Sequence, residues 1–506
     1  YGEWRWSPMG LAGRDPVFYS QLESEVSMLK GMLGEETGAF FGSQVVNTCL
    51  TCHGAMGKRT FDVDNGVAGE YWSEDSVFDL DWIYVTDPTD PRAKYAALAR
   101  DGISCTVCHH QVEAYDNIGD FLANSITGQF KMGPPDEIYG PYEDVVAKPM
   151  ENSTGLTPKY DPFIQSSRMC GTCHVINLPI VDWPLDNPPS DDGPPQEEIE
   201  QLLASQKNPN FQGFRHNIEQ ATYLEWLNSK YQDEFGPKHD EQRSCQDCHM
   251  RKEWHSSDGE IRIDPIKTKI ATIEDQDYPE ADHRLPVEDI TVKFREEGFR
   301  RHTFQGLNIF LLEMFRQFND VLGVRKMDFE TASNGLEFAI YNSIQNARER
   351  TATVEIVNYE AAGNQIVADV KITNLTGHRL PSGVGFRRLF VEFVVLDNSG
   401  DRERVVWASG RTNGVGVLVD WDGNILPEEF FTEEEKDGKA TQRYHHHHQV
   451  IDSQNQVQVY EELAHNAERR FTTSFIRRAH HVKDNRLLPQ GWTKDGPSPE
   501  IPSAFV

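Results

Sequence analysis

The chain of 506 residues has no apolar run that approaches the length needed to cross a bilayer. Residues 307–315 and 389–396 are both too short for a spanning helix, so we expect no membrane span. Basic residues are also few, because 49 Lys and Arg stand against 80 Asp and Glu and give a formal net charge of −31. That charge repels nucleic acid and anionic lipid, and it favours basic partners, cations or a saline medium. We therefore expect no nucleic-acid partner; the alternative interpretation is only a well-hydrated surface.

Cysteine is scarce, and every copy falls inside one repeated pattern. The pattern is C-x-x-C-H, and it occurs four times between Cys49 and His249, using all eight cysteines. The copies comprise Cys49, Cys52 and His53; Cys105, Cys108 and His109; Cys170, Cys173 and His174; and Cys245, Cys248 and His249.

C-x-x-C-H is the attachment signature of c-type haem, in which each thiol forms a thioether to a haem vinyl and the adjacent His ligates the iron. The alternatives are a zinc ribbon, a redox dithiol or disulfides. A zinc site would use the Cys pairs together without a fixed His, and a redox dithiol would occur once. Four copies that consume all the cysteine favour four covalently bound haem c groups. Their proximal iron ligands are predicted to be His53, His109, His174 and His249.

The second axial position of each iron needs a further ligand. A distal His lowers the potential relative to Met, and an open position permits substrate chemistry. Of the 18 His, 14 lie outside the motifs, so bis-His ligation of every haem is expected. Met169 and Met250 flank motifs and are poor distal candidates for their own irons. The candidate distal ligands are His110, His283, His302 and His378.

Each candidate has a local rationale beside the alternative of an ordinary surface or packing role. His110 follows a proximal ligand, so it faces away from its own haem and could reach a neighbour. His302 opens a predicted apolar helix, and His378 lies in a tight turn that could dock the C-terminal region onto a haem. The ordinary role is favoured for His216, His239 and His255. The runs at residues 445–448 and 480–481 are predicted to be solvated loops.

Periodicity predicts an α+β fold with a loop-rich, haem-dominated part, short helices and a C-terminal antiparallel β-sandwich. Helices are predicted from about residue 16 to Gly34, from an N-cap at Asn217, and over residues 306–322 and 330–350. Residues 186–196 are expected to be an exposed irregular excursion. Strands are predicted over residues 351–358, 365–373, 389–396, 404–409, 449–460 and 470–475. The predicted parts are a tetrahaem domain (1–325), a linking helix (326–350) and a β-sandwich domain (351–506).

Six segments resemble large secreted multihaem c-type cytochromes of environmental bacteria and archaea, a family related to filament-forming extracellular cytochromes, or nanowires. The likeness spans nearly the whole chain and is specific for a multihaem cytochrome with a C-terminal β-domain. The segments are SRMCGTCHVINLP (167–179), EQATYLEW (219–226), SCQDCHM (244–250), HTFQGLN (302–308), GHRLPSG (377–383) and DNRLLP (484–489).

The resemblance is less specific for any activity, and the favoured interpretation is an electron carrier rather than an enzyme. Four low-potential haems would relay electrons to an extracellular acceptor, as a polymerised filament or as a discrete periplasmic or surface carrier. Its partners would be other copies of itself and redox donor and acceptor proteins or minerals. The alternative is a reductase or oxidase of nitrogen or sulfur oxyanions. Such an enzyme needs a five-coordinate haem, sometimes marked by C-x-x-C-K, whereas all four motifs here end in His. A subunit of a membrane-associated respiratory complex is a third interpretation.

The predicted location follows from the family and from the start of the sequence. Haem is attached to such proteins outside the cytoplasm, and the sequence begins at Tyr1 without a charged-then-apolar leader. We expect a mature secreted protein at the cell surface or in the extracellular medium, with the periplasm as the alternative.

Overall fold

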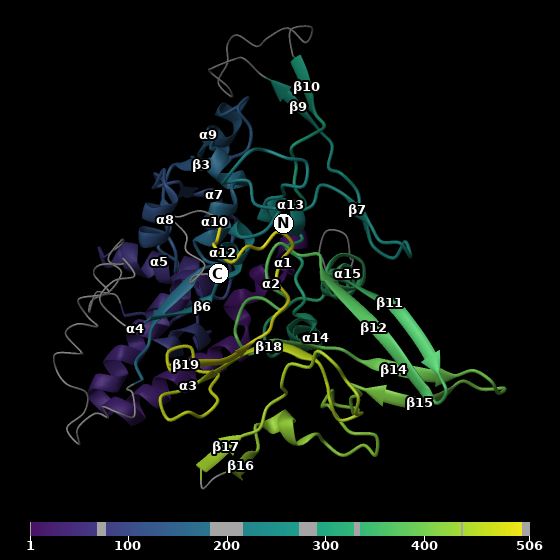
Figure 1. Ribbon diagram of the computed structural model, residues 1–506. Coiled ribbons are helices and arrows are strands. Elements are labelled where there is room, and N and C mark those ends of the chain that lie inside the picture. The colour runs from purple at the N-terminus through teal and green to yellow at the C-terminus, as the bar shows by residue number, and fades with distance from the viewer. Residues whose placement is uncertain are drawn as a thin grey trace, which may run out of the picture.

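The computed structural model describes residues 2–67, 77–182, 216–272, 291–327, 334–436 and 439–497. It confirms the predicted α+β class: helices dominate the first half, and short antiparallel strands in small sheets dominate the last third (Figure 1). Within these residues no helix is both long and apolar enough to cross a membrane. The predicted excursion at residues 186–196 and the candidate ligand His283 lie outside the described residues.

Two long antiparallel helices form the N-terminal part of the core. In α3 (Pro16–Leu33), the Asp15 side chain caps the N-terminus by accepting from the amides of Val17 and Phe18, which confirms the helix predicted there. Gly34, at φ +82°, ends α3 and leads into α4 (Glu35–His53). Their buried faces share one apolar cluster, which includes Leu22, Leu29, Phe41, Val46, Leu50 and, from the far end of the chain, Phe475 and Ile476.

The segments around the motifs are short helices and two-stranded ladders joined by loops. The antiparallel pairs are β1–β2, β5–β6, β7–β8 and β9–β10, and β3–β4 is parallel. The helices are α1 (Gly2–Arg5), α2 (Pro8–Leu11), η1 (Ala12–Arg14), α5 (Ala55–Asp64), η2 (Leu80–Tyr84), α6 (Ala93–Ala99), α7 (Cys105–His109), α8 (Ile118–Asn124), α9 (Lys148–Thr154), η3 (Pro162–Gln165), α10 (Ser167–Gly171) and α13 (Cys245–His249). The strands are β1 (Gln111–Val112), β2 (Lys131–Met132), β3 (Glu137–Gly140), β4 (Thr157–Tyr160), β5 (Ile176–Pro179), β7 (Trp254–His255), β8 (Arg262–Ile263), β9 (Thr268–Thr272) and β10 (Thr291–Arg295).

The helix predicted to begin at Asn217 is wrong in its first turn. Residues His216–Gln220 form β6, which pairs antiparallel with β5, and α12 begins only at Thr222 and ends at Leu227. The capping pattern around Asn217 is a local signal, and pairing with a partner strand overrides it. The apolar residues further along this segment are in the core, because Leu224 and Leu227 are fully buried in a cluster with Phe121 and Tyr223.

The chain returns to its N-terminus after the fourth motif. Helices α14 (Ile309–Gln317) and α15 (Gly335–Arg350) confirm the two helices predicted in this region. They pack on each other and on Trp6 and Leu11 in a cluster with the buried Leu312, Phe315 and Leu336. The N-terminal turns are therefore part of the core.

The C-terminal strands only partly match the predicted ranges. The stretch predicted over 389–396 is interrupted after β13, because Val391 hydrogen-bonds to Gln458 and not along the ladder of β14. The stretch over 449–460 yields strand only from Val459, no named strand covers 470–475, and β19 was not predicted. The strands are β11 (Ala352–Ala362), β12 (Gln365–Asn374), β13 (Arg388–Phe390), β14 (Phe393–Asp397), β15 (Arg404–Ser409), β16 (Glu433–Lys436), β17 (Lys439–Gln442), β18 (Val459–His465) and β19 (His480–Asp484), with η5 (Pro427–Phe430) between β15 and β16.

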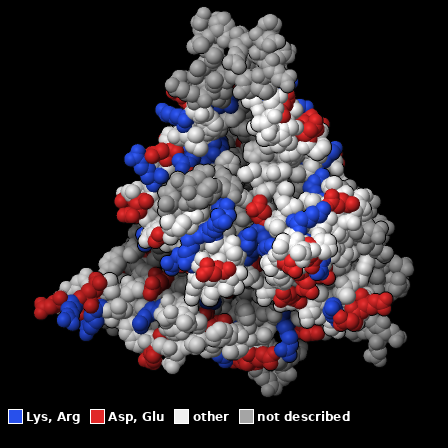
Figure 2. Space-filling view, turned by 180° about the vertical axis from the view of Figure 1, so that it is seen from behind, with Lys and Arg blue, Asp and Glu red and all other residues white. Residues whose placement is uncertain are grey.

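The C-terminal region packs into the helical region. Figure 1 shows β18 and β19 passing beside α3, while the ribbons β11–β12 and β14–β15 project away on the other side. The amide of Val181 donates to the carbonyl of Ile476, and Ser474 and Phe475 donate to the buried carboxylate of Glu25. On the face seen in Figure 2, basic side chains gather near the centre and acidic ones spread around them.

Candidate haem-binding site

Each C-x-x-C-H motif lies on or at the end of a helical turn. The first motif ends α4, the second is α7, the fourth is α13, and the third begins in α10. Residues three apart lie on the same face of a helix, so the two thiols of each motif project together. Ser244 and Asp247 form a capping box on α13, which fixes the start of that short helix. The geometry suits two thioether bonds to one flat group.

The third motif is the point at which the other three motifs meet. A hydrogen bond to Cys173 raises the pKa of Cys52, and the same bond lowers the pKa of Cys173. Cys170 and Cys245 are coupled in the same way, with the pKa of Cys170 raised and that of Cys245 lowered. The third motif therefore touches the first and the fourth through their thiols.

Backbone and side-chain contacts support the same arrangement. The amide of Cys245 donates to Oγ of Ser167 at 3.1 Å, which ties the fourth motif to the helix of the third. Oγ1 of Thr172 donates to Oε1 of Gln111 at 3.3 Å, two residues after His109, which ties the second motif to the third. Groups attached at the four motifs would thus be neighbours, with the third in the middle.

Three of the four proximal His have a defined partner at Nδ1. His109 donates to the Tyr139 carbonyl at 2.7 Å, His174 to Oε1 of Gln220 at 2.9 Å, and His249 to the Gln305 carbonyl at 2.8 Å. A donor at Nδ1 fixes the tautomer and leaves the lone pair on Nε2, the nitrogen that would bind a metal. In His53, Nδ1 is buried near the Ala12 carbonyl without a well-formed hydrogen bond, and its ring stacks on Phe18 at 3.6 Å between centroids.

Two predicted distal ligands face a proximal His. The ring centroids of His109 and His302 are 6.4 Å apart with planes 27° apart, and those of His249 and His378 are 6.5 Å apart with planes 16° apart. These separations are too long for ring contact. A metal ion held between two imidazoles by bonds of about 2 Å requires ring centres about 6 Å apart. The residues therefore fit bis-His iron at the second and fourth motifs.

Burial keeps four imidazoles of the site neutral. Burial lowers the pKa of His53 and of His249 to about 4, and burial also lowers the pKa of His174 and His302. A neutral imidazole has a free lone pair at pH 7, whereas a protonated one has none.

The segment from Arg301 to Gln305 serves both of these His pairs. The amide of His302 donates to Oε2 of Glu3 at 3.1 Å, and Arg301 forms an ion pair with the same carboxylate. Three residues later, the Gln305 carbonyl accepts from His249 and its side chain donates to the Cys248 carbonyl at 2.7 Å. One short segment thus places His302 opposite His109 and orients His249.

The turn that carries His378 is held by a buried carboxylate. Glu225, on α12, is almost fully buried and accepts from the Arg379 amide at 3.1 Å, from Ser382 Oγ at 2.7 Å and from Arg486 Nη1 at 3.3 Å. Burial would lower the pKa of Arg486, but its hydrogen bond to Asp484 and the charge of Glu225 raise it, so its guanidinium stays charged. Nδ1 of His378 donates to the Arg379 carbonyl at 2.9 Å, which leaves Nε2 for the metal.

The remaining His residues take other places. His110 is buried beside His109, and within the described residues its ring does not face a proximal His. The solvated loop predicted at residues 445–448 is wrong at its first position, because His445 is buried and lies 2.9 Å from the buried Glu429. Glu429 also pairs with Arg388 of β13 and accepts from the Leu418 amide, and the His run does not reveal these distant partners. His239 is exposed.

Several functional residues carry no motif of their own. Tyr139, Gln305 and Arg379 act through backbone carbonyls, which any residue offers, so no sequence signal marks them. Glu225, by contrast, is an acidic residue in an apolar helical stripe, and a buried acid of that kind indicates a partner. That signal was present in the sequence.

Comparisons with known proteins add little to this geometry. No family model matches the chain, and no curated protein matches it. Among solved structures, the chain is similar to a penta-heme cytochrome c552 from Thermochromatium tepidum, at 14% sequence identity and a TM-score of 0.40, over 96% of this chain and 81% of that one. The likeness is too low to assign a fold family or an activity.

Replacing Glu225 by Ala should lower the free energy of unfolding by about 2–3 kcal/mol, because it removes the shared acceptor of the His378 turn and leaves the buried Arg486 with only Asp484 and Glu462 as charge partners. Urea unfolding at pH 7 measures this. The matched control is Glu355→Ala, an exposed carboxylate on β11. A loss below about 1 kcal/mol in Glu225→Ala would contradict the role assigned to this carboxylate.

A second buried acid lies beside the first motif. Glu219, on β6, is 7% exposed, and its Oε1 has no hydrogen-bond partner among the described residues. Burial raises its pKa to about 7, against the opposing charges of Arg478 and Arg387. Burial, and then the charge of Glu219, also raises the pKa of Cys49. The carboxyl is therefore half protonated near neutral pH.

Because the folded-state pKa of Glu219 is raised, its contribution to stability is complete below its ordinary pKa of 4.5 and is lost as pH rises through about 7. Glu219→Gln should remove this fall and make the variant more stable than the wild type at pH 8 by up to about 3 kcal/mol, while the two converge near pH 4. Urea unfolding across this pH range is the measurement. The exposed Glu360→Gln serves as control, and parallel profiles for Glu219→Gln and wild type would refute the assignment.

Proposed function

We propose that this chain binds four haem c groups covalently and serves as a multihaem electron carrier. The observation that carries the proposal is the pairing of His109 with His302 and of His249 with His378 across gaps that fit a six-coordinate metal. Haem iron supplies reversible one-electron chemistry when bound. The chain supplies the thiols, the axial imidazoles and their second hydrogen bonds.

The placement of the motifs supports transfer through the protein. The first and fourth motifs both contact the third through thiols, and the second lies against the third through Thr172 and Gln111. Attachment points this close would keep four bound haems near one another, as electron hopping needs. With His302 and His378 as ligands, iron at the second and fourth motifs would have no open position for a substrate. The carrier is proposed over the oxyanion reductase because all four motifs end in His and none is the C-x-x-C-K variant.

Ligand variants test the proposal directly. We expect the wild type to hold four haems, all low-spin, and His302→Ala and His378→Ala each to convert one of the four to a high-spin form, because each removes one axial nitrogen. Pyridine haemochrome absorbance counts the haems, and electron paramagnetic resonance reports their spin states. His239→Ala is the matched control, since that side chain is exposed.

Three outcomes would change the conclusion. Protein without covalent haem would end the proposal. An unchanged spin state in both variants would end the ligand assignment. A wild type that already contains a high-spin haem able to bind nitrite or sulfite would favour the reductase instead.

We further propose that copies of this protein associate, as a filament-forming extracellular carrier would. The support is the ribbon β11–β12, whose register places eight apolar side chains on one face, beyond Asn374 at its base: Val354, Ile356, Tyr359, Ala361, Ile366, Ala368, Val370 and Ile372. Val354, Ile356 and Tyr359 are each at least 60% exposed. The opposite face pairs polar residues, such as Glu355 with Lys371.

The size of this apolar face sets the strength of the contact. Ten paired positions at about 3.4 Å each make a ribbon about 34 Å long, and its two strands make it roughly 10 Å wide. One face therefore covers on the order of 350 Å², roughly half of one side of a standard interface. A patch without charge also lets two acidic copies approach. The association is expected to be concentration-dependent, and secretion to the cell surface is the setting in which it would carry electrons outward.

Ile356→Glu should shift assemblies to single chains, because it places a charge in the centre of the apolar face. Light scattering over a range of protein concentrations measures the mass, and cryo-electron microscopy shows whether the assemblies are filaments. Gln365→Glu adds the same charge to the polar face of the ribbon and is the control. A wild type that stays a single chain at every concentration would reject association.

A further inference from the structure

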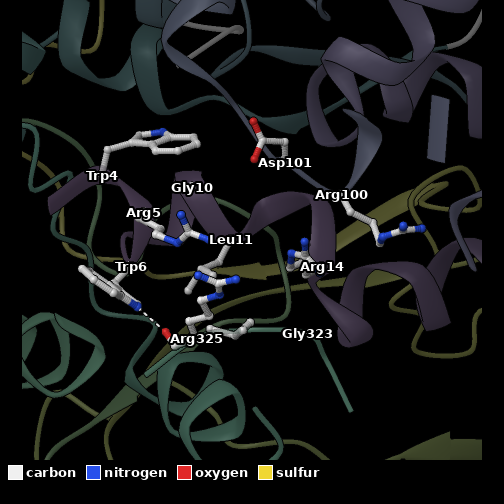
Figure 3. A pocket seen from close by; sticks show the side chains of 11 residues that line it. Trp4, Arg5, Trp6, Gly10, Leu11, Arg14, Arg100, Asp101, Gly323 and Arg325 are labelled. Atoms are coloured by element: carbon white, nitrogen blue, oxygen red, sulfur yellow. Dashed lines mark hydrogen bonds between the residues drawn. The ribbon is translucent and has the colours of Figure 1, made fainter. Parts of the chain in front are cut away.

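A small cavity lies where the N-terminal turns meet the segment that follows α14. Its volume is ≈ 40 Å³, enough for about three water-sized groups. Its wall includes Arg5 from α1, Arg14 from η1, Arg100 and Asp101 after α6, and Arg325 from the segment after α14. Figure 3 shows Arg5, Arg14 and Arg325 close together from separate segments, with the indole rings of Trp4 and Trp6 beside Arg5, while the guanidinium of Arg100 points outward.

The charge around this arginine cavity is opposite to that of the protein. Four guanidinium groups and one carboxylate line it, in a chain with a net charge of −31. Burial lowers the pKa of Arg14, and the nearby charges of Arg100 and Arg5 lower it further, while Asp101 opposes them. Burial also raises the pKa of Asp101. Positive charges crowded this way repel one another, and an anion between them would relieve the repulsion.

The cavity is built rather than incidental. Indole Nε1 of Trp4 donates to the Ile103 carbonyl at 2.6 Å, and Nε1 of Trp6 donates to the Arg325 carbonyl at 2.6 Å. These two bonds hold the N-terminal turns to segments that are distant in the sequence. Arg14 Nη1 donates to the Leu322 carbonyl at 3.2 Å. Gly323, at φ +65°, lets the backbone approach Arg14, because a Cβ there would lie 2.7 Å from its Nη1. Uncharged carbonyl oxygens orient two of the guanidinium groups, that of Arg14 at Leu322 and that of Arg100 at Val85.

We propose that the arginine cavity binds a small anion with two or more oxygens, either a carboxylate or an oxoanion of the size of phosphate. Guanidinium groups present forked donors that match such oxygens in pairs. The volume excludes a nucleotide. Two sources share this chemistry: a free oxoanion from solution, and a propionate of a bound haem.

The second source is close at hand. Ile103, which accepts from Trp4, lies two residues before Cys105, and the Ala12 carbonyl lies next to His53. The haem source rests on the proposed function, whereas the free oxoanion does not. Counting haems by absorbance shows whether the proposed haem binding itself has failed or only the proposal for the arginine cavity.

The test uses the holoprotein at low ionic strength. Calorimetric titration with inorganic phosphate measures free-oxoanion binding, with chloride as the ionic-strength control. Arg325→Gln and Arg14→Gln should weaken saturable one-to-one binding at least tenfold. Arg404→Gln, an exposed arginine paired with Asp397, should leave it unchanged. Because Arg14 also holds Leu322, the exposed Arg325 is the safer variant if Arg14→Gln fails to fold.

If the wild type does not bind phosphate, spectroelectrochemistry in phosphate-free buffer measures the haem potentials and tests whether a haem propionate occupies the cavity. One haem potential should then fall in both Arg325→Gln and Arg325→Lys, because Lys keeps the charge but loses the forked donors, and it should not fall in Arg404→Gln. A potential that Arg325→Lys restores reflects only a distant charge and overturns the proposal. So does the absence of both phosphate binding and any shift in potential.

Discussion

The fixed orientation of buried imidazoles is the constraint on which the rest of this structure depends. An imidazole can bind a metal only if it is neutral and its proton is held on the other nitrogen. Here burial lowers the pKa of His174 and His249, and the Nδ1 acceptors of four rings are Tyr139, Gln220, Gln305 and Arg379. Every one of these acceptors comes from a segment distant in sequence from the His it serves, except Arg379. The fold must therefore be assembled before the ligands are aligned.

The charge network around Glu225 shows how distant segments are brought together. The carboxylate joins α12 to the turn of His378 and to Arg486 near the C-terminus. Segments 219–226, 377–383 and 484–489 therefore meet at this point. A buried ion pair adds little stability over apolar packing, but breaking one is costly, so this network specifies the position of His378 more than it stabilises the fold.

Sequence reasoning could reach the helices and the ligands whose signals are local. The Asp15-Pro16 start of α3, the helices at 309–317 and 335–350, and the attachment motifs depend on neighbouring residues. The start at Asn217 failed because strand pairing with β5 is not a local property. The neighbouring residues in the sequence mark His302 and His378 as candidate ligands. They do not reveal which proximal His each one faces, because a 6.4 Å gap between rings is a property of the assembled chain.

The segment from Arg301 to Gln305 has one further consequence for the way the site works. It carries a ligand for one His pair and a hydrogen-bond acceptor for the proximal His of the other, and Phe304 between them has φ +42°. A non-glycine residue rarely adopts that conformation, so contacts on both sides must hold it. A shift of this segment would move the His302 ring and the Nδ1 acceptor of His249 together. The second and fourth motifs are thus mechanically linked through five residues, in addition to their shared contact with the third.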